Sequence, residues 1–166
     1  MTSGGATDFD FDALGRAINE FALLEVHCHA VLHDFWDVPA PDAWTTTRAW
    51  PYSRVIQELG SEGEHSRYAA DLRSEFRVLV DDLRDLGRER NRVAHTALWP
   101  NGNSRGLVAF QPKDAADGVS LTSSTAANSA VTDLRERIRT VRESLILASE
   151  ALIEHRRAEG WEPWPG

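Results

Sequence analysis

The residues best suited to catalysis by type and spacing lie in one hexapeptide, Arg90–His95, which reads Arg-Asn-Arg-Val-Ala-His. Asn91 and His95 are four positions apart, so on a helix their side chains share a face, with Arg90 at its edge. An imidazole exchanges protons near neutral pH, and a guanidinium binds phosphate through two parallel hydrogen bonds. Together these groups suit attack of a ribose 2′-hydroxyl on its neighbouring phosphate, with the arginine stabilising the charge that develops. That reaction requires no metal.

The same residues also have a purely structural interpretation. Arginine, asparagine and histidine are frequent where a helix ends, because cations interact favourably with the negative end of the helix dipole. Spacing alone therefore leaves both a catalytic and a structural role open.

The hexapeptide resembles the Arg-polar-x3-His motif of the HEPN superfamily, in which the residue after the arginine is typically Asn, Asp or His. The flanking sequence is similar too. A long amphipathic helix is expected before the motif (Asp71–Glu89), an aromatic residue follows it (Trp99), and another amphipathic helix is expected early in the chain (Phe11–Leu32). HEPN domains are all-α bundles of four or five helices, and they commonly dimerise so that two motifs face each other.

The resemblance implies a metal-independent endoribonuclease that works as a homodimer. Arg90, Asn91 and His95 would be its catalytic residues, and Arg88 and Arg92 would contact the RNA. Relatives of this kind act in toxin–antitoxin and antiviral defence systems, so an antitoxin is an expected protein partner. Other HEPN domains are inactive, which leaves a dimerisation or partner-binding module as the alternative. Neither a cofactor nor a metal is expected.

Length and composition indicate one globular domain. The chain has 166 residues, of which 42% are hydrophobic and 27% charged, and it carries a net charge of −8. We expect a flexible leader over 1–8, a helical domain over 9–159 and a non-helical tail over 160–166. Because the chain is acidic, any RNA contact must come from a local cationic cleft. We find no signal peptide and no apolar run of membrane-spanning length, which predicts a cytoplasmic protein.

The predicted fold is an all-α, HEPN-like bundle of four to five helices. Three- and four-residue spacing of apolar side chains predicts helices over 11–35, 52–60 and about 66–95, and a last helix ending near 157. A break is expected at 38–42 with a loop over 45–47, because two prolines are followed by three threonines. Gly87 should loosen the third helix. β-Rich sequence over 105–122 predicts a small hairpin inserted after the motif helix.

The first helix carries several polar residues that could have a function. Glu25 lies on or beside its apolar stripe, where we expect an ion pair with Arg90 or Arg92, or a supporting role in catalysis. His29 and His33 are four apart, as two imidazole ligands of one zinc ion would be. No third ligand is evident, so ordinary helix histidines are the simpler interpretation of these two and of His27.

Two further clusters could contact RNA. Arg135, Arg137, Arg139 and Arg142 form a basic patch at the start of the last helix, although interleaved glutamates also fit a solvated surface. Trp36, Trp44 and Trp50 are expected to clamp the loop onto the bundle, with base stacking as the functional alternative.

Overall fold

The computed structural model of the chain describes residues 9–36, 38, 40–65, 67–94, 99–100, 106–110 and 119–161. Its helices are α1 (Phe11–Trp36), α2 (Ala40–Thr47), α3 (Tyr52–Gly63), α4 (Ala70–Ala94) and α5 (Ser124–Ala158). Between α4 and α5 lie three short strands, β1 (Trp99–Pro100), β2 (Gly106–Phe110) and β3 (Val119–Ser123). They pair antiparallel in the order β1-β2-β3. The predominantly helical architecture agrees with the hydrophobic periodicity of the sequence.

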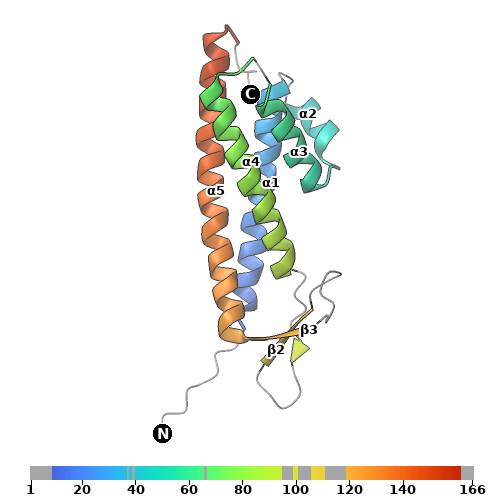
Figure 1. Ribbon diagram of the computed structural model, residues 1–166. Helices are drawn as coiled ribbons and strands as arrows, with labels where there is room; N and C mark the ends of the chain where they lie inside the picture. The colour runs from blue at the N-terminus through green and yellow to red at the C-terminus, as the bar shows by residue number, and fades with distance from the viewer. Residues whose placement is uncertain are drawn as a thin grey trace.

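The long helices α1, α4 and α5 lie side by side and form the body of the molecule (Figure 1). Contacts between Glu20 and Arg135, and between Asp34 and Ser149, show that α1 and α5 run in the same direction. Helix α3 packs against α4 and α1, with α2 beside it towards one end of the body, and the strands lie at the opposite end (Figure 1). None of the described helices combines the length and apolar character needed to cross a bilayer.

The core follows the apolar stripes of these helices. Its largest fully buried side chains are Phe21, Phe35, Phe76, Leu24, Leu32, Ile56, Leu59, Leu83, Leu86, Leu134, Ile138 and Leu145. Burying a side chain of this size contributes about 1.5–3 kcal/mol, so this packing is the main force that fixes the positions of the helices.

Two arginines bind the carboxyl end of α1. Arg67 donates to the carbonyl of Phe35 at 3.1 Å, and the buried Arg156 donates to the carbonyl of Asp34. These carbonyls belong to the last turn of α1 and have no partner within the helix. The cations also interact favourably with the negative end of the helix dipole, so this end of α1 is tied both to α5 and to the chain before α4.

Residues 45–47, predicted to form a loop, instead end helix α2. Each threonine hydroxyl donates to the carbonyl four residues earlier, at 2.9 Å for Thr45, 3.1 Å for Thr46 and 3.1 Å for Thr47. Because each hydroxyl bonds to a carbonyl of its own helix, the threonine side chains do not draw the backbone into a non-helical conformation. Pro41 lies in the first turn, where its missing N–H is not needed. Helix α3 is longer than predicted, and α4 begins later, at Ala70. The predicted leader, most of the predicted tail and residues 111–118 lie outside the described residues.

Candidate functional site

A pocket of about 690 Å³ lies where α1, α3 and α4 meet. It is lined by Phe21, Glu25, Pro51, Tyr52, Ser53, Ile56, Gln57, Arg84, Gly87, Arg88, Arg90 and Asn91. Pockets of about 300–1,000 Å³ typically hold small organic ligands. The sequence-predicted residues Glu25, Arg88, Arg90 and Asn91 are thus brought together in one place.

Arg90 is held in a defined orientation at the edge of this pocket. Its Nη1 donates to Oδ1 of Asn91 at 2.9 Å, and its guanidinium carbon lies 4.7 Å from the centre of the Phe21 ring. Its Nε is buried and has no hydrogen-bond partner among the described residues. The ring and the amide fix the position of the guanidinium, and because Nε is buried, only the terminal nitrogens can donate to a ligand.

Helix α4 ends at Ala94, so the motif residues Arg90 to Ala94 form its last turn. His95, the predicted proton-transfer residue, lies outside the described residues. Arg92 is exposed and lines a second, shallower groove with Arg88, Glu89 and others. The two predicted RNA-contacting arginines, Arg88 and Arg92, therefore both line this groove, and Arg88 also lines the pocket.

One wall of the pocket is set by a contact between α3 and α4 that sequence reasoning missed. The Tyr52 hydroxyl donates to the carbonyl of Leu83 at 2.9 Å, and its ring lies 5.0 Å from that of Phe21. Burial raises the pKa of the Tyr52 hydroxyl, which keeps it a neutral donor. A Cβ at Gly87 would lie 2.8 Å from Cε1 of Tyr52, so only glycine admits the ring here. The sequence feature that could have indicated this contact is Gly87, a glycine inside an otherwise regular amphipathic helix.

The pocket also carries polar side chains from α3 and α1. Ser53 and Gln57 are four residues apart on α3 and both are exposed. Glu25 is half-buried on α1. Glu25 and Arg90 both line the pocket, but the ion pair predicted between them is not found among the described residues. The pocket thus combines an apolar floor with hydrogen-bonding groups from three helices.

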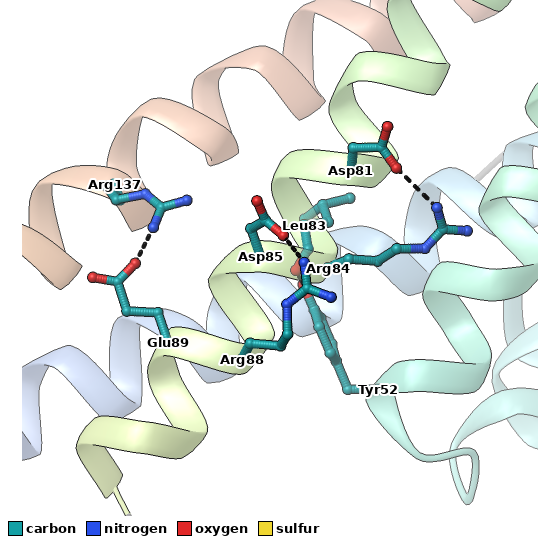
Figure 2. A network of polar contacts seen from close by, with 8 residues as sticks. All are labelled: Tyr52, Asp81, Leu83, Arg84, Asp85, Arg88, Glu89 and Arg137. Atoms are coloured by element: carbon teal, nitrogen blue, oxygen red, sulfur yellow. Dashed lines mark hydrogen bonds and ion pairs between the residues drawn. The ribbon is translucent and has the colours of Figure 1, made fainter.

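Most arginines around the site are already paired with carboxylates (Figure 2). Arg84 binds Asp81 at 2.9 Å, and Arg88 binds Asp85 in the same i,i+3 arrangement on α4. Figure 2 shows Arg137 reaching from α5 to Glu89 of α4. The exposed i,i+3 pairs of Arg84 and Arg88 contribute little stability, so a phosphate can displace their aspartates.

The basic patch on α5 is also largely neutralised. Arg135 forms a two-pronged contact with Glu20, at 2.7 and 3.3 Å, and Arg139 lies 3.5 Å from the same carboxylate. The hydrogen bond from Arg135 lowers the pKa of Glu20 below its usual value of 4.5, despite partial burial. Three of the four arginines predicted as a supplementary RNA contact therefore serve to join α5 to α1 and α4.

His29 and His33, two of the three histidines of α1, have structural contacts. Nδ1 of His29 lies 2.9 Å and Nε2 of His33 lies 3.2 Å from the same Thr47 hydroxyl, which donates to the carbonyl of Ala43. With its proton used in this way, the hydroxyl accepts from both rings, which fixes their tautomers. Burial lowers the pKa of both histidines, so both are neutral. Within the described residues no cluster of ligands could hold a metal ion.

The tryptophans pack as the sequence predicted for a clamp. The Trp36 and Trp50 rings meet edge to face with centres 5.6 Å apart, and Arg54 stacks on Trp50 at 3.8 Å. Trp44 contacts the His29 ring at 5.4 Å and remains partly exposed. These contacts fasten α2 and the start of α3 to α1.

In comparisons with known proteins, the chain matches no protein-family model, no curated protein and no solved structure.

Proposed function

We propose that the chain is a HEPN-like, metal-independent endoribonuclease in which Arg90, Asn91 and His95 act on a phosphodiester. The observation that carries this proposal is the paired and oriented guanidinium of Arg90 at a pocket of ligand size. A cation held by a ring and an amide loses little conformational freedom when it binds an anion, which is what stabilisation of a transition state requires. The short strands between α4 and α5 would then be an insertion in a HEPN-like bundle.

In this mechanism His95 takes the proton of the ribose 2′-hydroxyl, and the 2′-oxygen attacks the adjacent phosphorus. The bond from phosphorus to the 5′-oxygen breaks, and His95 returns the proton to that leaving oxygen. Arg90 binds the non-bridging oxygens as their charge increases, and Asn91 holds the guanidinium in place. The products are a 2′,3′-cyclic phosphate and a 5′-hydroxyl.

The proposal is tested by measuring RNA cleavage in EDTA by the purified chain and by Arg90→Ala, Arg90→Lys and His95→Ala variants. We expect losses of about 10²–10⁴-fold for His95→Ala, the usual range for removing a general acid–base group. Arg90→Lys should also lose activity, because an ammonium ion lacks the planar two-pronged geometry. Retained folding is checked by circular dichroism.

Arg77→Ala is the matched control. Arg77 is an exposed α4 arginine paired with Glu64 at 2.7 Å and is not part of the pocket lining. Its loss removes one positive charge without touching the site, so cleavage should continue at the wild-type rate. Equal activity of the wild type, Arg90→Ala and His95→Ala would contradict the proposed mechanism.

A catalytically inactive binding module is the second candidate, and the ion pairs favour it. Arg84, Arg88, Arg135 and Arg137 all contact carboxylates, which reduces the positive potential available to RNA in a chain of net charge −8. Under this interpretation the purified chain binds a protein partner, and neither the wild type nor any variant cleaves RNA.

A homodimer is part of both proposals. Light scattering of the purified chain measures it directly, and a mixture of Arg90→Ala and His95→Ala chains tests whether the two motifs cooperate. Recovery of cleavage on mixing would indicate that one active site draws its arginine and its histidine from different subunits. If the mixture stays inactive, each subunit uses its own pair.

A further inference from the structure

The pocket between α1, α3 and α4 has a charge balance unlike that of the chain as a whole. Three arginines (Arg84, Arg88 and Arg90) line it against one carboxylate, Glu25. By contrast, the groove between α4 and α5 is lined by Glu75 and Asp82 and by no basic side chain among the described residues. Asp81 and Asp85 pair with Arg84 and Arg88, but no ion pair is found for Arg90 among the described residues. An anionic ligand is therefore favoured more in the first cavity than in the second.

The same pocket has apolar side chains beside its cations. Pro51 is exposed and Tyr52 half-buried, with the fully buried Ile56 behind them, and the absence of a Cβ at Gly87 leaves room for the tyrosine ring. A planar heterocycle packs well on an aromatic and aliphatic surface of this kind. A ligand that joins a phosphate to a planar base matches both parts of the cavity, and a volume of about 690 Å³ accommodates one nucleotide.

Glu25 adds a chemical preference among the bases. A carboxylate only accepts hydrogen bonds, through two adjacent oxygens. Among the common RNA bases, guanine presents two neighbouring N–H donors on one edge, from N1 and the exocyclic N2. Gln57 and Ser53, exposed residues of α3 that line the same pocket, can bond to the remaining polar atoms of the base or ribose.

We propose that this pocket is a guanine nucleotide site, with the phosphate at Arg84, Arg88 and Arg90 and the base edge at Glu25. The arginine pairs with Asp81 and Asp85 are exposed and can yield to a phosphate. The inference rests on the proposed function for the source of the nucleotide, which is a guanosine unit of the RNA strand. A free mononucleotide has the same chemistry and is the second source.

The test is titration calorimetry of the purified chain with GMP, AMP, UMP and inorganic phosphate. GMP should bind most tightly, ahead of AMP by roughly 5- to 150-fold, the usual worth of one two-pronged base contact. Glu25→Gln should weaken GMP by a similar factor and improve AMP, because an amide pairs well with adenine. Glu58→Gln is the matched control, since Glu58 lies on α3 outside the lining and should leave both affinities unchanged.

A parallel assay with RNA substrates that differ at a single position separates the two proposals. Preferential cleavage next to guanosine that is lost in Glu25→Gln supports both. GMP binding that depends on Glu25 without any cleavage supports the site and overturns the nuclease. Cleavage without base preference, together with equal affinity for the mononucleotides and phosphate, overturns the guanine site and leaves the nuclease standing.

Discussion

Gly87→Ala should destabilise the protein by wedging α3 away from α4. The added Cβ would lie 2.8 Å from Cε1 and 3.2 Å from Cδ1 of Tyr52, whereas carbon atoms in contact prefer about 3.5–4.0 Å. Overpacking of this kind costs about 1–3 kcal/mol. Alanine recovers about 0.5–1 kcal/mol through its better helix propensity. The clash outweighs this gain, and we expect a net loss of up to about 2.5 kcal/mol.

Thermal unfolding followed by circular dichroism measures this effect. For a chain of this size the predicted loss lowers Tm by up to about 10 °C. Gly15→Ala is the internal control, because Gly15 is exposed in α1 and a Cβ there meets nothing within 4 Å. That variant gains helix propensity without a clash, so its Tm should rise.

A double-mutant cycle assigns the effect to the tyrosine. In a Tyr52→Leu background the ring is absent, and Gly87→Ala should then behave like Gly15→Ala, with a coupling energy of about 1 kcal/mol or more. If Gly87→Ala raises Tm in the wild-type background, or if the two substitutions are additive, the contact between α3 and α4 does not have the geometry described.

Three other outcomes follow from the buried groups. The pKa values of His29 and His33 in the folded chain lie below the usual 6.5, so near and below that pH the unfolded chain binds more protons than the folded chain. Stability by urea denaturation should be constant well above about pH 6.5 and fall as the pH is lowered through about 6.5 towards about 5.5. An increase on acidification would contradict this. Thr47→Val should cost about 1–3 kcal/mol, since two ring N–H groups lose their buried acceptor, whereas Thr47→Ser should retain most of the stability. Cys28 is fully buried and its pKa is raised by burial, so a thiol reagent should modify it only at the rate of unfolding; rapid labelling of the folded chain would show that α1 is packed differently.

Helix α1 shows what the sequence could predict. Its predicted range of 11–35 differs from the observed end at Trp36 by one residue, because a long apolar stripe at helical spacing begins directly after acidic residues. Helix α2 shows the limit of the same method. Its threonines have low helix propensity, and the burial of Thr47 against His29 and His33 is a long-range contact that no local pattern contains.

The candidate site divides in the same way. The motif spacing identified Arg90 and Asn91 as neighbours on one helix, and the structure adds the hydrogen bond between them. The pocket itself depends on Tyr52 meeting Gly87, a contact between residues 35 positions apart in the sequence. Gly87 was expected to loosen α4; instead it lies in the continuous helix, and its lack of a Cβ leaves room for the Tyr52 ring of α3.

The central claim is that a guanidinium and an imidazole of the hexapeptide together break RNA chains. Mass spectrometry of the fragments formed from a defined oligoribonucleotide in EDTA tests it most directly. The account predicts fragments that end in a 2′,3′-cyclic phosphate with the wild-type chain and intact oligonucleotide with His95→Ala. Intact oligonucleotide with both, or fragments that end in a 3′-hydroxyl, would contradict it.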